Sequence, residues 1–250
     1  ASRRTFLKTT LVGGLLGTGG ILSAQTAPAV TPTRRRAKNL IFLVSDGMNN
    51  GTLALANHHC EIYRGQSCEW VSLMKEAGRG LSRALMKTDS ASSLVTDSAA
   101  AGSAWSCGQR IPNGSLNVDG DGKDLTPIYH YVHDAGKWTG LATTTRITHA
   151  TPASFAISHK ERNDEDIIAK KYLDSGVGIL LGGGSRHFDA AQRGDGLDLA
   201  KEFAGLGYKV MNQRDELVRP FEPGREPTSC PKHLGTFCES HLPNTIDWNN

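Results

Sequence analysis

The first candidate for a functional site is Thr96-Asp97-Ser98, which follows an apolar run and precedes a stretch of small residues that ends at Trp105. This change from β-prone to helix-compatible residues predicts that a helix begins at Ser98, where backbone N–H groups lack helical partners. Such N–H groups and the helix dipole make a helix N-terminus a binding site for anions. The ordinary interpretation of Ser98 is a helix cap, and the alternative is a residue of an anion site.

Three other candidates follow strand-like runs. Asp46 comes directly after the run 39–45, and His149 and Thr151 follow the run 139–145. In an open parallel sheet the carboxyl ends of the strands gather the ligands, so these side chains are expected at one edge. The competing interpretations are a turn aspartate before a glycine and an ordinary loop histidine.

Arg162 stands thirteen residues beyond His149. A guanidinium can bond two phosphate oxygens at once and stays charged at alkaline pH, whereas lysine does neither. Within Lys160-Glu161-Arg162 the default interpretation is a solvated surface arginine, so a functional role depends on the spacing.

The elements that must position these residues alternate between strands and helices, which is typical of an α/β fold with a mainly parallel sheet. The expected strands are 39–45, part of 80–93, 139–145, 177–181 and 208–211. The expected helices are 53–77 with an interruption at 65–67, 128–135, 153–160 and 197–206. The proline-rich stretch 219–250 is expected to form an irregular tail.

Composition limits the classes of protein to which this chain can belong. The 250 residues include 28 glycines and are 38% hydrophobic, so one domain with a sizeable core is expected. Arg3, Arg4 and Lys8 account for the whole excess of 28 basic over 25 acidic residues. The remaining chain is neutral and offers no argument for a nucleic-acid partner or an anionic membrane.

The N-terminus has the pattern of an export signal. Ser2-Arg3-Arg4-Thr5-Phe6-Leu7-Lys8 and the apolar run 11–24 are typical of a twin-arginine signal peptide. The apolar run is shorter than the roughly 20 residues that span a bilayer, so no stable membrane span is expected after cleavage. The expected organisation is a signal peptide at 1–27 and a linker at 28–38, with the mature protein periplasmic or secreted.

Five cysteines in an exported chain permit two disulfides and one leftover thiol. Cys60 with Cys68, and Cys230 with Cys238, are the expected short-loop pairs. Cys107, which follows the Ser98 helix, is the expected free thiol.

Three other motifs are interpreted as structural. His58-His59-Cys60 offers no complete zinc set. The polar loop 117–122 resembles a calcium loop, but Ile128 stands where a bidentate glutamate is required. The glycines at 182–184 lack the Gly-Lys-Ser/Thr of a P-loop, so a tight turn is expected.

Four segments, in this order, resemble the alkaline phosphatase family. They are the Asp-Gly-Met at 46–48, the nucleophile segment 96–105, the His-Ala-Thr-Pro at 149–152, and an arginine at the family's interval beyond it, Arg162. The resemblance implies a three-layer α/β sandwich with a mainly parallel central sheet, incomplete at the C-terminus. It covers roughly residues 39–250 as a truncated catalytic domain.

The resemblance also implies a reaction and its residues. Phosphate monoesters would be hydrolysed through a phosphoserine on Ser98, with release of inorganic phosphate. Arg162 would bind the phosphoryl group, oriented by Asp97. Two zinc ions and one magnesium ion are implied, and a homodimer is an assembly that the family allows.

Four residues carry the implied metal roles. Asp46 would bridge one zinc and the magnesium, Ser98 would be a zinc ligand, Thr151 would offer oxygen, and His149 would hold a magnesium-bound water. Imidazole is a poor direct ligand for magnesium, which prefers oxygen.

The remaining ligands of the family's zinc sites do not occur in this sequence. No Glu-x4-Asp-x3-His cluster is present, and no aspartate precedes any of the nine histidines. The chain is therefore expected to be a fragment that is inactive by itself. The alternatives are a non-catalytic anion-binding fragment, or a phosphodiesterase or sulfatase of the same superfamily, although a sulfatase requires Cys/Ser-x-Pro-x-Arg.

Overall fold

The computed structural model describes residues 38–75, 84–218 and 231–244. The chain divides into two compact units between Val44 and Ser45. No helix in the described part of the chain is long and apolar enough to cross a membrane. The expected signal peptide 1–27 lies outside the described residues.

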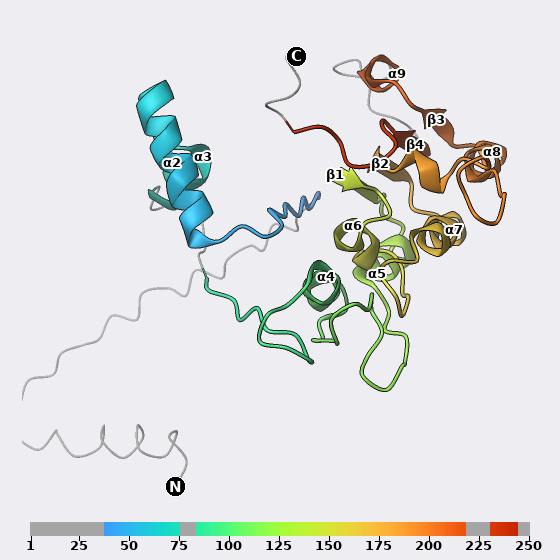
Figure 1. Cartoon of the computed structure of the whole chain (residues 1–250), viewed down its shortest axis with the longest axis horizontal. Helices are drawn as coiled ribbons and strands as arrows, with labels where there is room; N and C mark the ends of the chain where they lie inside the picture. Colours follow the sequence, from blue (N-terminus) through green and yellow to red (C-terminus); the bar gives the residue numbers. More distant parts are fainter. Residues whose placement is uncertain (1–37, 76–83, 219–230, 245–250) are drawn as a thin grey trace, which may run out of the picture. The chain divides into compact units, whose positions relative to one another are not determined.

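The centre of the second unit is a parallel four-stranded sheet (Figure 1). Its strands are β1 (Gly140–Arg146), β2 (Ile179–Gly183), β3 (Lys209–Met211) and β4 (His233–Thr236), in the spatial order β1-β2-β4-β3. Every neighbouring pair is parallel. The predicted mixed α/β fold with a parallel sheet is confirmed, and the strands expected at 139–145, 177–181 and 208–211 are present with ends shifted by one or two residues.

Strand β4 lies inside the stretch that the sequence predicted to be an irregular tail. It pairs with β2 through Leu180 and Leu234, and with β3 on its other side. A Cβ on Gly235 would lie 2.8 Å from the Leu181 side chain and 2.5 Å from the Phe237 ring, so only glycine fits there. Four residues with one large apolar side chain carry too weak a local signal, and the strand is stabilised by its two neighbours.

One helix directly precedes β1, and those after it occupy the connections between the strands. They are α5 (Ile128–Asp134), α6 (Ala150–Ser154), α7 (Glu165–Ser175), the 3₁₀ turn η1 (Ser185–His187), α8 (Leu199–Gly205) and α9 (Arg214–Val218). Helix α5 follows Pro127 as predicted, and α8 lies within the predicted range. Helix α7 has no counterpart in the prediction.

The core lies between the sheet and helices α7 and α8. Leu180 and Leu234 of the sheet are fully buried together with Ile168, Tyr172 and Phe203 of the helices. The hydroxyl of Tyr172 donates a hydrogen bond of 2.9 Å to the backbone oxygen of Ile147, which satisfies a buried polar group. This core fixes the carboxyl end of β1, where the candidate residues begin.

The strand predicted at 39–45 is absent from the structure. These residues are in neither helix nor strand, and Leu40 and Leu43 are 82% and 80% exposed. An apolar strand of this kind forms when strands pair with it and layers cover both of its faces. The four strands of the described sheet do not include it, so the prediction was wrong.

The strand predicted within 80–93 is also absent from the part that is described. Residues 84–93 are irregular and Leu85 is fully exposed. Residues 76–83 lie outside the described part. The apolar pair Leu94-Val95 is likewise exposed rather than part of a strand.

The helical pattern expected from residue 53 is confirmed as α2 (Asn50–Arg64) and α3 (Glu69–Lys75). Helix α2 ends at Gly65, whose φ of +68° is the left-handed conformation that glycine adopts at low cost. Cys60 and Cys68 are both free, so the disulfide expected between them is not formed. Cys230 lies outside the described residues, while Cys107 is free as expected and Cys238 is also free.

Candidate functional site

The helix that carries Ser98 is α4 (Ser98–Cys107), which confirms the predicted start. Asp97, not Ser98, is the N-cap: its backbone is extended and its Oδ1 accepts a hydrogen bond of 2.8 Å from the N–H of Ala100. Interpreting Ser98 as the helix cap is therefore wrong. Its hydroxyl lies in the first turn, at the positive end of the helix dipole, and is available for other contacts.

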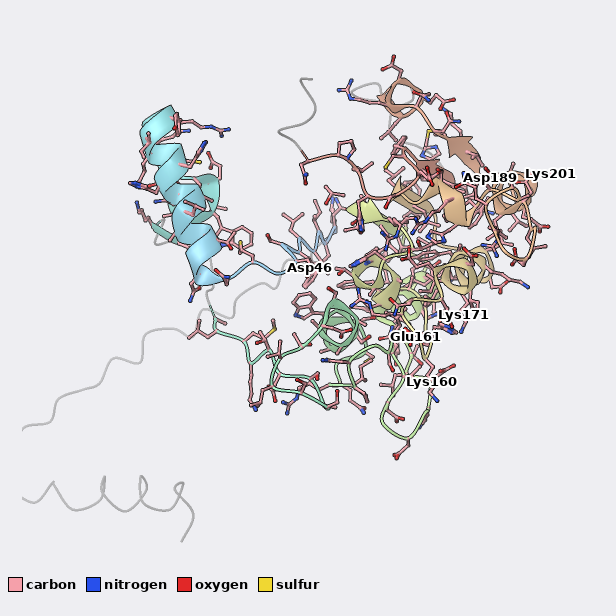
Figure 2. All side chains as sticks on the ribbon, viewed as in Figure 1. Asp46, Lys160, Glu161, Lys171, Asp189 and Lys201 are labelled. Atoms are coloured by element: carbon pink, nitrogen blue, oxygen red, sulfur yellow. The ribbon has the colours of Figure 1, made fainter. Side chains whose placement is uncertain are left out.

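Two hydroxyl groups from separate segments meet at the Asp46 carboxylate. Figure 2 shows Asp46 on the turn that precedes α2. Its Oδ2 accepts hydrogen bonds from the Ser98 hydroxyl at 2.9 Å and from the Thr151 hydroxyl at 2.8 Å. The structure thus brings together side chains 52 and 105 positions apart in the sequence.

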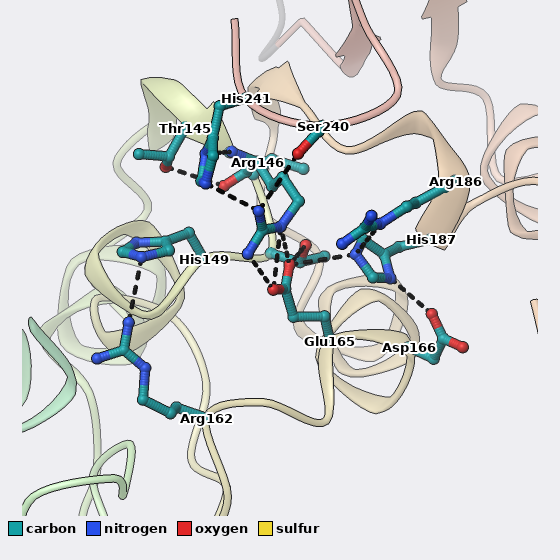
Figure 3. Close-up of polar contacts among 12 residues, drawn as sticks. Thr145, Arg146, His149, Arg162, Glu165, Asp166, Arg186, His187, Ser240 and His241 are labelled. Carbon is teal, nitrogen blue, oxygen red and sulfur yellow. Dashed lines mark hydrogen bonds and ion pairs between the residues drawn. The ribbon is translucent and has the colours of Figure 1, made fainter.

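Asp97 also holds Arg162 beside the serine. Its Oδ2 accepts hydrogen bonds from Arg162 Nη1 at 3.0 Å and from the backbone N–H of Gly114 at 2.9 Å. The other terminal nitrogen of Arg162, Nη2, lies 3.1 Å from Nε2 of His149 (Figure 3). One carboxylate therefore caps the serine helix and orients the guanidinium.

Arg162 does not follow a helix, contrary to the prediction for 153–160. Helix α6 begins at Ala150 and ends at Ser154. Beyond it, Leu116 and His159 exchange two backbone hydrogen bonds of 2.8 Å, and the backbone N–H of Arg162 donates to the Gly114 oxygen. Pairing with residues distant in the sequence outweighs the local helical tendency of this segment.

Helix α4, which carries Ser98, packs closely against helix α6, which carries Thr151. A Cβ on Gly102 would lie 2.2 Å from the Ser154 hydroxyl oxygen, so glycine permits this approach. Asn117, whose expected structural role in a turn is confirmed, supports both helices: its N–H donates to the Ser103 hydroxyl, and its amide nitrogen donates to the Ser154 oxygen. Asn117 is fully buried.

Electrostatics favour a neutral His149. Burial, followed by the positive charge of Arg162, lowers the pKa of His149 below its ordinary value. An uncharged imidazole can accept a hydrogen bond from Arg162 through Nε2. The backbone N–H of Thr151 lies farther from the ring, at 3.5 Å from Nδ1.

All six predicted site residues are thus brought together, in two connected groups. Asp46, Ser98 and Thr151 form one group, and Asp97, Arg162 and His149 form the other, with Asp97 and Ser98 adjacent in the chain.

A polar network beside His149 was missed by the sequence analysis. Arg146, Thr148, Glu165 and His187 form it, and His241 lies against Arg146 (Figure 3). Arg146 directly follows the predicted strand 139–145. The rule that functional groups follow strand ends, which was applied to His149, would therefore have identified Arg146 as well. Glu165 carried no comparable signal.

The donor set suits a hard cation but does not complete a zinc site. Asp46, Ser98 and Thr151 present oxygen atoms, which magnesium prefers. Catalytic zinc normally has three protein ligands, drawn from histidine, cysteine and carboxylates. Within residues 38–75, 84–218 and 231–244, no group of three such side chains could hold a metal ion.

Together, the fold and site define an α/β protein with a serine at a helix N-terminus, flanked by a carboxylate and a guanidinium, beside the carboxyl end of a parallel strand. A family model described as alkaline phosphatase matches residues 37–250. The chain belongs to the alkaline phosphatase family.

Individual relatives agree with this assignment. The repressible alkaline phosphatase of Saccharomyces cerevisiae is 32% identical over 242 residues, covering 90% of this chain and 42% of that protein. Alkaline phosphatase 3 of Bacillus subtilis is 29% identical over 93% of this chain and 48% of its own length. This chain therefore spans less than half the length of these curated relatives.

Solved structures share the fold of this chain. The crystal structure of Thermus thermophilus alkaline phosphatase superposes with a TM-score of 0.74 at 40% identity, covering 82% of this chain and 41% of that one. A structure of the TAB5 alkaline phosphatase, described as a histidine-to-aspartate mutant with magnesium bound in its M3 site, has a TM-score of 0.63 at 24% identity, over 78% of this chain and 53% of its own.

Proposed function

We propose that the full-length protein containing this chain hydrolyses phosphate monoesters, with Ser98 as the nucleophile. The observation that carries the proposal is the double role of Asp97. Its Oδ1 caps the Ser98 helix, and its Oδ2 binds Arg162. A nucleophile and a phosphate-binding guanidinium are thereby held in a fixed relation, which is what phosphoryl transfer requires.

Each residue then has a defined part in the reaction. Arg162 and the free N–H groups at the start of α4 bind the phosphoryl oxygens, where negative charge spreads in the transition state. The Ser98 oxygen gives up its proton to solvent and bonds to phosphorus while the bond from phosphorus to the ester oxygen breaks and the leaving alcohol takes up a proton. Water then attacks the phosphoserine, which restores the Ser98 hydroxyl and releases inorganic phosphate. Asp46 accepts the hydrogen bond of the Ser98 hydroxyl and keeps its oxygen in place.

Two zinc ions and one magnesium ion are proposed cofactors. Asp46, Ser98 and Thr151 would hold metal through oxygen, and His149 would hold a metal-bound water. When bound, the metal lowers the pKa of the serine hydroxyl. The described residues supply only part of the ligands, so we propose that this chain is a fragment of the enzyme and is inactive by itself.

Replacing Ser98 tests the nucleophile assignment. Ser98→Ala should lower phosphate-ester turnover by about a thousandfold or more and abolish the acid-trapped phosphoenzyme. The matched control is Ser175→Ala on α7, whose hydroxyl bonds only the Tyr172 backbone oxygen and should leave turnover unchanged. Comparable turnover in Ser98→Ala at normal metal content would exclude Ser98 as the nucleophile.

Two alternatives have distinct outcomes in the same assays. A non-catalytic anion-binding protein would bind inorganic phosphate through Arg162 without turning over any ester. A phosphodiesterase or sulfatase of the same superfamily would turn over diesters or sulfate esters faster than monoesters. Both alternatives predict that phosphate monoesters are poor substrates.

We also propose that residues 1–27 are a twin-arginine signal peptide, residues 28–38 a linker, and residues 39–250 the truncated catalytic domain. The double arginine Arg3-Arg4 and the following apolar run support this organisation. The protein would act in the periplasm or outside the cell.

A further inference from the structure

We propose that Glu165 is a positioning residue for this site, because it holds in place the strand end that leads to His149 and Thr151. The proposal rests on the proposed function, since the site concerned is the same. Its basis is a set of contacts that one carboxylate makes with three segments of the chain (Figure 3).

The first partner of Glu165 is Arg146 at the end of β1. Arg146 Nε lies 3.0 Å from Oε1 and 2.8 Å from Oε2, and Nη2 lies 2.5 Å from Oε1. Both side chains are largely buried, with 16% of Arg146 and 11% of Glu165 exposed. A two-pronged ion pair of this kind fixes direction as well as distance.

The other partners extend the network to two further segments. The hydroxyl of Thr148 donates a hydrogen bond of 2.6 Å to Oε2, and Nε2 of His187 lies 3.2 Å from the same oxygen. His187 belongs to the turn η1 beyond β2, and its Nδ1 lies 2.6 Å from Asp166. The carboxyl ends of β1 and β2 are thus joined through Glu165.

Glu165 closely follows Arg162, the proposed phosphate-binding arginine, in the chain. It is the first residue of α7, three positions beyond Arg162. Its contacts therefore connect the segment that carries Arg162 to the segment that carries His149. A displacement of one would be passed to the other through this carboxylate.

The link to His149 is short. Thr148 directly precedes it, and the backbone N–H of His149 donates to the Arg146 oxygen at 2.9 Å, which closes the turn. The guanidinium nitrogen Nη1 of Arg146 lies 2.8 Å from Nε2 of His241, and the His241 ring lies edge-on to His149 with centroids 5.8 Å apart. Thr148 is thus connected to His149 through the chain, and Arg146 through this backbone hydrogen bond and through His241; both are held by Glu165.

The charge of Glu165 is needed for this arrangement. Burial acts to raise the pKa of Glu165, but hydrogen bonds from His187, Arg146 and Thr148 outweigh it and hold the pKa well below its ordinary value. Glu165 is therefore ionised wherever the protein is folded at ordinary pH. Without the negative charge, Arg146 would remain largely buried beside an uncharged partner, which is unfavourable and favours rearrangement.

The chain offers a matched control in a second ion pair. Arg193 and Asp195 form a similar contact, with the Arg193 side chain 1% exposed. Arg193 also donates to the backbone oxygens of His187 and Asp166 and lies 4.0 Å from the Asp166 carboxylate. The pair therefore reaches the network at His187, but none of its described contacts is with Glu165, Arg146, Thr148 or His149. Asp195→Asn should lower stability without affecting the site.

The experiment compares Glu165→Gln, Thr148→Val and Asp195→Asn in the full-length protein. The readouts are kcat, KM, the magnesium concentration for half-maximal activity, the thermal midpoint, and the His149 ring signal in a ¹H–¹³C spectrum of histidine-labelled protein. Glu165→Gln should lower kcat by about 10- to 100-fold, raise the magnesium requirement and shift the His149 signal. Asp195→Asn should lower the thermal midpoint and leave kcat within about twofold.

Two outcomes would overturn the proposal. One is a folded Glu165→Gln protein with unchanged kcat, magnesium requirement and His149 signal. If Glu165→Gln does not fold, Thr148→Val provides the test, because it removes one hydrogen bond to Glu165 and keeps the ion pair with Arg146. A lower kcat and a shifted His149 signal in Thr148→Val would support the proposal. Unchanged values would overturn it. If the wild-type protein has no phosphatase activity, the proposed function fails, and the His149 signal alone then decides the positioning role.

Discussion

At the scale of single residues, the two oxygens of Asp97 have separate tasks. Oδ1 accepts from the Ala100 N–H and so caps α4, while Oδ2 accepts from Gly114 and Arg162. A carboxylate can do both because it has about four lone-pair sites, whereas an amide presents only one acceptor oxygen. The two tasks can therefore be separated by substitution.

Asp97→Asn should keep the cap and lose the ion pair with Arg162, whereas Asp97→Ala should lose both. Asparagine is as good an N-cap as aspartate, so we expect Asp97→Ala to be less stable than Asp97→Asn by about 1 kcal/mol. Both variants should bind inorganic phosphate more weakly than wild type. Chemical denaturation and calorimetry measure the two effects, and equal stability of both variants would contradict the capping role.

The pH dependence of stability isolates the charge of Glu165. Because its folded pKa is lowered from an ordinary value of 4.5, the carboxylate stabilises the fold above that pH and loses this contribution as the pH falls below it. Wild type should therefore exceed Glu165→Gln in stability by a constant amount between pH 8 and about 5, and by progressively less toward pH 3. Urea midpoints across this range test it, and a difference that grows on acidification would contradict it.

At the scale of elements, the relation between Ser98 and Thr151 depends on how closely α4 and α6 approach. Gly102 faces Ser154, whose hydroxyl donates to the Thr151 backbone oxygen at 2.8 Å. The contact is set by the absence of a side chain at position 102. A larger residue there must separate the two helices and, with them, the two hydroxyl groups that meet at Asp46.

Gly102→Ala should therefore destabilise the protein by about 1–3 kcal/mol and lower kcat, although alanine favours helices. Gly102→Ala with Ser154→Ala should recover part of the loss, because the 2.2 Å contact to the hydroxyl oxygen is removed. The control is Gly205→Ala in α8, where a Cβ meets nothing within 4 Å and should be neutral or stabilising. Equal stability of Gly102→Ala and wild type would contradict this account.

At the scale of the whole molecule, the last of the described strands, β4, lies inside the sheet rather than at its edge. β4 lies between β2 and β3, so residues near position 234 hold together strands that begin at 179 and 209. Leu234 is fully buried in the same core as Leu180 and Tyr172. Loss of packing at this point should affect the entire sheet.

Leu234→Ala should cost about 2–5 kcal/mol of unfolding free energy, because it leaves a cavity in the core. Leu206→Ala is the control, since this side chain is 50% exposed and its loss should change stability by less than about 0.5 kcal/mol. Denaturant titration of both variants tests the prediction. A cost below 1 kcal/mol for Leu234→Ala would show that β4 is not integral to the core.

Local chemistry in the sequence was sufficient to predict several parts of this protein. A cap residue followed by small residues placed the start of α4, a threonine-rich run of strand length placed β1, and an apolar run placed β2. The six candidate residues were identified from motifs and spacing, and the structure brings all six together. These signals are local because capping, periodicity and turn chemistry operate within a few residues.

Tertiary structure alone decided what depends on partners distant in the chain. Residues 39–45 have the composition of a strand but not its structure, whereas residues 233–236 have little strand character and lie within the sheet. Glu165 was unremarkable until folding placed it between Arg146, Thr148 and His187. Strand pairing and buried ion pairs depend on which groups meet in space, and no local pattern carries that information.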